Sequence, residues 1–204
     1  MKRLAIIIGL LFLCYSAFGQ DVSIINDENV ESYRKIQTGY LPWLKKGLVD
    51  LPFSLQYFSP TGSEDAYYTL VFKVSCGTVR RSLPEGSKMF VKLDDDSIIE
   101  MQTISEIEEY QNEYEIIPTL NATYYYIYPT YLATPEQIQQ MIEHKIVKVR
   151  QQTTWGEGYY DIPNENLKIR LKHMCLTENL TRMKLSIDKR LERTETQDDI
   201  LKGF

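Results

Sequence analysis

The sequence is poor in cysteine and histidine, the residues on which disulfide scaffolds and most structural zinc sites depend. It contains three cysteines and two histidines in 204 residues. Because Cys14 lies in an N-terminal apolar segment, a disulfide in the rest of the chain requires Cys76 and Cys175. Both lie in apolar stretches where a buried free thiol also packs well, so the bridge and the free thiols stay open as alternatives. No metal site is predicted, because two cysteines without a histidine cluster do not match the ligand pattern of zinc.

Motifs for catalysis and cofactor binding are also missing. The chain has no Gly-x-Ser-x-Gly elbow, no His-Glu-x-x-His pair and no glycine-rich phosphate loop. Glu143 and His144 have chemistry for ligation or proton transfer, but no similar residue lies one helical repeat away, which favours a structural role. The acidic turn at residues 94–96 lacks the glycine and the glutamate of a calcium loop, so a hairpin turn is predicted there. We therefore predict no catalytic residues and no cofactor.

Positive charge is missing from a stretch in the middle of the chain, and acidic residues outnumber basic ones in the chain as a whole, 28 to 23. The formal net charge is −5, and this excess of acid argues against nucleic-acid binding, which depends on phosphate neutralisation. Residues 94–117 contain nine acidic residues and no lysine or arginine, whereas residues 168–193 contain eight basic and three acidic residues. The interpretation favoured here is two solvated faces of one domain; the alternative is a basic helix that faces anionic lipid or polysaccharide.

Long apolar runs are absent except at the N-terminus. The run Leu4–Leu13 follows a lysine and an arginine and precedes small or neutral residues that end at Gly19. This order is typical of a secretory signal peptide, and the run is shorter than the roughly 20 residues that span a bilayer. We predict that residues 1–19 are removed and that the mature chain begins at Gln20, without a transmembrane segment.

Export places the mature protein in the periplasm or outside the cell. A lipoprotein of the outer membrane is the alternative, since a leucine lies three residues before Cys14. The residue directly before a lipidated cysteine is normally small, however, and here it is Leu13. Ordinary cleavage is therefore the prediction.

The mature chain of 204 − 19 = 185 residues is long enough for one domain with its own core. We predict a loosely ordered lead-in at residues 20–34, a single globular domain at 35–193 and a frayed tail at 194–204. The predicted fold is α+β, a mainly antiparallel sheet or sandwich of seven to eight strands with one short helix and a C-terminal helix. Short runs of aromatic, β-branched or alternating apolar residues predict the clearest strands, which are Leu51–Phe58, Tyr67–Cys76, Lys88–Leu93, Ser97–Gln102 and Tyr124–Tyr128.

Two segments predict helices. Thr134 offers an N-cap for a helix near 135–145, with proline at the first helical position and a glutamine at the capping-box spacing. Apolar residues at helical spacing predict a C-terminal helix over Leu176–Leu191, preceded by alternation typical of a strand at residues 167–171. Residues 104–117 are ambiguous between a short helix and a loop with a strand end.

Tyrosine is the residue that the chain has in excess, with 15 copies. On a strand, Tyr124, Tyr126 and Tyr128 point to one face, where three rings can stack on sugars. The more common fate of such tyrosines is to fill the edge of a β-core, and Trp155 carries the same ambiguity.

The segments YYTLVFKVS, PEGSKMFVKLDDDSIIEM and IYPTYLATPEQIQQMIEHKIVKVR together resemble small exported proteins of unassigned function from Gram-negative gut bacteria. The resemblance covers roughly residues 67–150 and implies an open sheet or sandwich with helices. It supplies no catalytic residues. The predicted function is a non-enzymatic envelope protein that binds a ligand, such as a glycan, or an envelope protein through an aromatic or sheet-edge surface. The alternative is a small polysaccharide hydrolase with paired carboxylates, whose positions only a fold determines.

Overall fold

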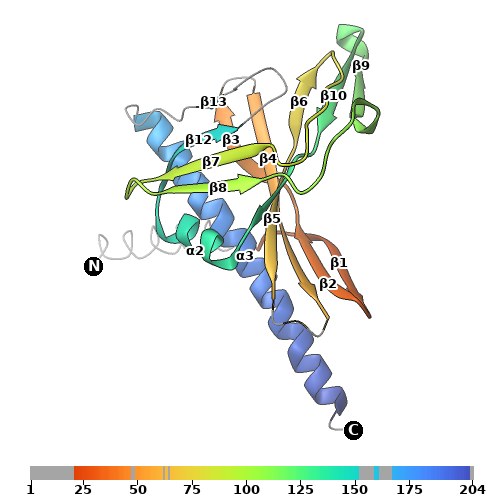
Figure 1. Ribbon diagram of the computed structural model, residues 1–204, viewed down its shortest axis with the longest axis vertical. Coiled ribbons are helices and arrows are strands. Elements are labelled where there is room, and N and C mark those ends of the chain that lie inside the picture. Colours follow the sequence, from red (N-terminus) through yellow and green to blue (C-terminus); the bar gives the residue numbers. More distant parts are fainter. Residues whose placement is uncertain are drawn as a thin grey trace, which may run out of the picture.

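The computed structural model describes residues 21–46, 49–61, 63, 65–151, 159–160 and 167–202. These residues form sheets of six, four and three strands together with two α-helices (Figure 1). All strand pairs in the sheets are antiparallel. The predicted α+β class, with mainly antiparallel strands, a short helix and a C-terminal helix, is therefore confirmed, although the strands outnumber the seven or eight predicted.

The six-stranded sheet is organised around one long strand. Its order is β1-β2-β4-β5-β11, and β3 also pairs with β4. Because β4 is 12 residues long, β2 and β3 both pair along it, at its C-terminal and N-terminal parts, while β5 pairs on its other side. The strands are β1 (Ile24–Val30), β2 (Tyr33–Thr38), β3 (Leu41–Lys46), β4 (Val49–Pro60), β5 (Tyr67–Phe72) and β11 (Thr130–Ala133).

The four-stranded sheet has the order β13-β12-β7-β8. Its strands are β7 (Lys88–Leu93), β8 (Ile98–Gln102), β12 (Ile146–Gln151) and β13 (Tyr159–Tyr160). The predicted half-buried strand and its hairpin partner are β7 and β8, since Met89, Val91 and Leu93 are buried while Lys88 is exposed. Asp96 turns the hairpin in the left-handed region, at φ 68°.

The three-stranded sheet projects beyond the rest of the molecule (Figure 1). It has the order β6-β10-β9. Its strands are β6 (Val74–Gly77), β9 (Glu113–Ile117) and β10 (Ala122–Ile127), with 3-10 turns η1 (Glu109–Gln111) and η2 (Pro118–Leu120) at the two ends of β9. We refer to these three strands as the projecting sheet.

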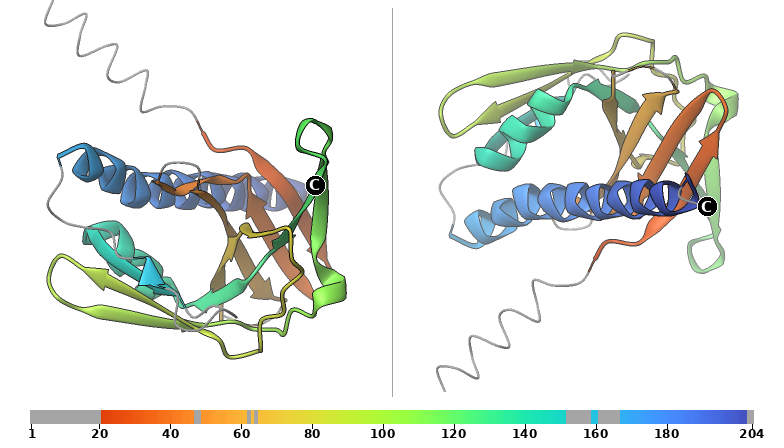
Figure 2. Two further views of the ribbon diagram at one scale, coloured as in Figure 1. Left: turned by 90° about the horizontal axis from the view of Figure 1, so that it is seen from above. Right: turned by 90° about the horizontal axis from the view of Figure 1, so that it is seen from below.

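The helices are α2 (Pro135–Glu143) and α3 (Leu167–Lys202). The predicted capping box of α2 is present: the Thr134 hydroxyl accepts from the Gln137 N–H at 3.2 Å, and the Gln137 side chain accepts from the Thr134 N–H at 2.9 Å. Ile138 and Met141 form its buried stripe. Helix α3 lies along the six-stranded sheet, where it contacts β2, β3 and β4, and it also contacts α2 and β12 (Figure 2).

One main core joins these layers. It gathers fully buried side chains from the six-stranded sheet, the four-stranded sheet and both helices, among them Leu55, Met101, Ile138 and Met183. A second, smaller core of Cys76, Leu83 and Ile127 underlies the projecting sheet. Within the described part of the chain, no helix combines the length and the apolar character needed to cross a membrane.

Three segments differ in detail from the sequence-based expectation. The lead-in predicted at residues 20–34 contains the paired strand β1, which no strong local pattern marks. The alternation predicted as a strand at residues 167–171 lies within α3, because two leucines four residues apart are also one helical repeat apart. Helix α3 continues through Lys202, beyond the tail boundary predicted at residue 194.

Candidate functional site

The projecting sheet presents two chemically different faces. Residues that lie opposite each other in an antiparallel pair point to the same face. Tyr124 lies opposite Glu115 and Tyr126 lies opposite Glu113, so one face combines tyrosines with carboxylates. On the other face, Tyr125 lies opposite Tyr114. The alternation of β9 therefore separates acidic from apolar side chains.

On the first face, the carboxylates bind the tyrosine hydroxyls. The Tyr126 hydroxyl donates to Glu115 Oε2 at 3.1 Å, and the Tyr128 hydroxyl donates to Glu113 Oε2 at 2.6 Å. Burial, followed by these bonds to a carboxylate, raises the pKa of both tyrosines above the usual value. Both phenols therefore stay neutral at physiological pH and act as donors.

The three predicted tyrosines are half-buried, neither core residues nor a free row of rings. The Lys73 ammonium lies 4.3 Å from the centre of the Tyr126 ring, and Tyr40 meets the Tyr128 ring edge-on at 6.3 Å. A sugar that stacked on the same face of Tyr126 would have to displace the ammonium. This arrangement favours a structural role for the three tyrosines, in which they hold the sheet together, and it argues against a surface that is ready to bind sugars.

The outer edge of the projecting sheet is open, and its second face carries exposed apolar side chains together with Arg80, whose guanidinium lies 5.3 Å from the centre of the Tyr125 ring. Within the described residues, β9 pairs with β10 alone, so its other edge faces away from the sheet. Tyr114 and Ile116 are 65% and 63% exposed, and Tyr110 and Leu120 beside the strand are 71% and 62% exposed. Sequence reasoning predicted a sheet-edge surface but did not locate it, because residues 104–117 were ambiguous between helix and strand.

Asn112 fixes the start of β9 to the body of the protein. Its side chain accepts from the Arg81 N–H at 2.8 Å and donates to the Arg81 carbonyl at 2.8 Å and to the Glu108 carbonyl at 3.2 Å. Leu83 and Ile107 exchange two backbone hydrogen bonds of 2.8 Å beside it. These contacts close the small core beneath the projecting sheet.

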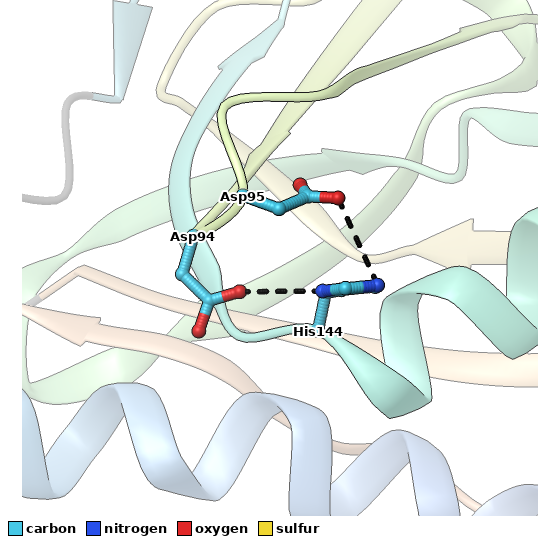
Figure 3. A group of neighbouring side chains, drawn as sticks. All are labelled: Asp94, Asp95 and His144. Atoms are coloured by element: carbon cyan, nitrogen blue, oxygen red, sulfur yellow. Dashed lines mark ion pairs between the residues drawn. The ribbon is translucent and has the colours of Figure 1, made fainter.

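A second cluster lies far from the projecting sheet, at the β7–β8 turn of the four-stranded sheet. Asp94, Asp95 and His144 meet there (Figure 3). The aspartates belong to the β7–β8 turn, and His144 is the C-cap of α2. His144 Nδ1 is 3.6 Å from Asp94 Oδ1, and His144 Nε2 is 3.7 Å from Asp95 Oδ2. One ligand atom from each of the three residues lies within 4.8 Å of the others.

Hydrogen bonds fix both aspartates. Asp95 Oδ1 accepts from the Ser97 N–H at 3.0 Å and from the Ser97 hydroxyl at 2.6 Å, and these bonds hold the pKa of Asp95 below its usual value. Asp94 Oδ1 accepts from the Lys145 N–H at 3.1 Å. Asp96, the third acidic residue of the turn, pairs with Lys92 at 2.6 Å.

An open groove of about 590 Å³ adjoins this cluster. Its lining includes Asp94, Glu143, Lys145, Arg182 and Leu185, contributed by the β7–β8 turn, the end of α2 and helix α3. The groove therefore brings residues of both charge signs, from three separate segments, next to the Asp–His cluster.

The remaining predicted site residues divide between described and undescribed positions. Cys76 is a buried free thiol, and burial raises its pKa, so it is a poor nucleophile. The side chain of Cys175 lies outside the described residues, and so does Trp155.

The sequence analysis considered the acidic turn and His144 separately and did not predict that they lie next to each other in the fold. The signal that joins them is the pairing of β7 with β12, in which Leu93 lies opposite Ile146 and so places the turn beside the end of α2. This long-range register has no local pattern in the sequence.

No protein-family model, no curated protein and no solved structure matches this chain.

Proposed function

We propose that this protein is an exported, non-enzymatic component of a Gram-negative cell envelope that binds an extended segment of a partner protein along β9. The single observation that carries the proposal is the exposed apolar edge of the projecting sheet. The charged, apolar and small-residue order of positions 1–19 supports the export part of the proposal.

If a partner protein adds a strand of its own to this edge, the exposure of an apolar edge strand is explained. Proteins commonly protect the edges of their sheets with lysine, proline, bulges or a covering element, because an open edge pairs with other chains. Strand β9 has the sequence EYEII, with neither lysine nor proline, and its register with β10 is regular. Such an edge offers backbone hydrogen bonds to an incoming strand, and its alternating side chains supply specificity.

The charges around β9 indicate the chemistry of the partner segment. Five exposed glutamates lie on or beside β9, at positions 106, 108, 109, 113 and 115, and they outnumber the two cations that lie over tyrosines of this sheet, Lys73 at Tyr126 and Arg80 at Tyr125. A partner strand that places lysine or arginine beside the acidic face and aliphatic residues beside Tyr114 and Ile116 complements both faces at once. We therefore expect a basic segment in which cationic and aliphatic residues alternate.

The test uses short synthetic peptides, labelled with a fluorophore, in which lysine alternates with valine or isoleucine. Fluorescence anisotropy should show saturable binding to the protein, and peptides that replace lysine with glutamate should not bind. Ile116→Lys should weaken binding by about tenfold or more, because it places a like charge on the apolar side of the strand.

The matched control is Ile98→Lys, since Ile98 is 64% exposed and lies on β8, the end strand of the four-stranded sheet. This variant should bind the peptide as the wild type does. Equal binding by the wild type and the Ile116→Lys variant would contradict the proposal. If no peptide binds but a glycan array shows retention that Tyr126→Ala removes, the tyrosine face is the binding surface instead.

A further inference from the structure

The chain itself contains a segment with the chemistry that the open edge of β9 requires. Residues 167–172 have the sequence LKIRLK, in which three aliphatic and three cationic residues alternate without interruption. On an extended strand, such alternation places the cations on one face and the aliphatic residues on the other. Strand β9 has the complementary order, since its two glutamates alternate with Tyr114 and Ile116. The two segments therefore match as neighbouring strands.

We infer that residues 167–172 of one copy of this protein add to the open edge of β9 in a second copy. The inference rests on the proposed function, because it names the partner segment for the same edge. Main-chain hydrogen bonds between the two strands supply affinity, and the alternating side chains supply specificity.

One antiparallel register satisfies both faces of β9 at once. The pairs that it forms are Arg170 with Glu115, Lys172 with Glu113, Ile169 with Ile116 and Leu171 with Tyr114. Opposite charges and apolar pairs that lie directly across from each other both stabilise antiparallel strands. A shift by one residue would place the cations beside the apolar face of β9, so the alternation also fixes the register.

The segment reaches the edge of a second copy and not the edge of its own sheet. Residues 167–172 form the start of α3, and this end of the helix lies on the opposite side of the molecule from the projecting sheet (Figure 1 and Figure 2). Each copy therefore offers one donor segment and one open edge. A contact between two different surfaces repeats from copy to copy and gives an open assembly where the rotation does not close a ring.

The first turns of α3 are the part of the helix best able to exchange helix for strand. Residues 167–172 bring three cations to the end that carries the positive pole of the helix dipole, and the first turn contains no acidic residue. Helix ends also open at lower free energy than helix centres. The described core residues of α3, Leu180, Met183 and Ile187, lie farther along the helix. Donation of the first turns therefore leaves these core contacts in place.

Sedimentation velocity of the exported chain, residues 20–204, tests the inference at increasing protein concentration. The wild type should form oligomers whose mean mass rises with concentration. Ile116→Lys alters the edge and Arg170→Glu alters the donor segment, and each should weaken association by about tenfold or more. Arg170→Glu places an acidic residue near the positive pole of the α3 dipole, so a loss of association in this variant does not come from a weaker helix.

A mixture of the two variants tests whether the two surfaces bind each other. Ile116→Lys keeps an intact donor segment and Arg170→Glu keeps an intact edge, so an equimolar mixture should form 1:1 complexes and nothing larger. Glu115→Arg combined with Arg170→Glu should restore association, because opposite charges again lie across from each other. Arg193→Glu is the matched control: it makes the same charge change at an exposed position of α3 outside the segment, and it should associate as the wild type does.

Peptide binding separates this inference from the proposed function. A fluorophore-labelled LKIRLK peptide should bind the dilute wild type, and LLIKRK, which has the same composition without the alternation, should not. If the lysine–valine peptides bind while LKIRLK does not and the protein stays monomeric, the inference is wrong and the proposed function stands. If neither kind of peptide binds, both are wrong. Oligomers that persist unchanged in Ile116→Lys or in Arg170→Glu would also overturn the inference, since association would then use another surface.

Discussion

At the scale of single residues, tyrosine takes opposite roles in this chain. Tyr131 is fully buried, and its hydroxyl oxygen accepts a hydrogen bond from Gln151 Nε2 at 2.7 Å. Tyr110 and Tyr114 are 71% and 65% exposed. Tyrosine supports both roles because its ring is apolar and its hydroxyl needs a partner only where water is excluded.

Tyr131→Phe should therefore destabilise the protein, although the ring is retained. Gln151 is 5% exposed, and the change leaves its buried amide without this acceptor. The expected loss is about 1–3 kcal/mol in the free energy of unfolding, measured by urea titration. Tyr110→Phe is the control and should be neutral, since its side chain faces water. Equal stability of the wild type and the Tyr131→Phe variant would show that the buried bond adds nothing.

At the scale of elements, the projecting sheet is held by fewer contacts than the main body. Its core consists of three buried side chains, Cys76, Leu83 and Ile127, with partly buried neighbours, whereas the main core draws on all the other layers. Regions with small cores open at lower free energy than the rest of a protein. The Asn112 contacts compensate in part, because they tie the start of β9 to Arg81 and Glu108 directly after η1.

Asn112→Ala should loosen this sheet selectively. It removes three hydrogen bonds and leaves the partly buried Arg81 N–H and carbonyl without this partner. Hydrogen exchange should become faster in β9 and β10 and remain unchanged in β4 and β5, with a loss of about 1–3 kcal/mol in local stability. Asn121→Gly is the control in the same sheet, since Asn121 has a φ of 46°, where glycine is unstrained. Uniformly faster exchange across the molecule would contradict a separate unit.

At the scale of the whole molecule, the N-terminal end of the described chain packs against the middle of helix α3. The Val22 N–H donates to the Ser186 hydroxyl at 3.0 Å in a buried contact, and Asp21 pairs with Lys189 at 2.6 Å. Farther along α3, Arg34 donates to Thr194 at 3.3 Å. Helix α3 therefore holds the N-terminal strands to the body, and its last turns extend past the β1–β2 hairpin (Figure 1).

We expect the exported protein to begin at Gln20. Intact-mass measurement of protein from the periplasm or medium should give residues 20–204, or that mass less ammonia if the N-terminal glutamine has cyclised. The contacts of Val22 leave only Gln20 and Asp21 ahead of the packed chain, so removal of residues 1–19 leaves every hydrogen bond described here in place. A diacylglycerol adduct on Cys14 would contradict the prediction and would anchor the protein to a membrane. Cys14→Ala is the control, and it should leave the mass of the mature chain unchanged.

The sequence by itself determined the elements whose signals are local. Alternation predicted β7 and β8, aromatic and β-branched residues predicted β5, and Thr134 with its proline and glutamine predicted the start of α2. Such signals are local because hydrogen bonds of a cap and the two faces of a strand involve residues only a few positions apart.

Only the tertiary structure decided which strands share a sheet, which edge stays open and which side chains meet. Strand β1 has no strong pattern of its own and forms because β2 supplies its hydrogen bonds. The exposed edge of β9 is a consequence of its position at the end of a sheet, and the approach of His144 to Asp94 follows from the pairing of β12 with β7. These features depend on contacts between residues far apart in the sequence, and chain folding brings such residues together without leaving a local trace in the order of amino acids.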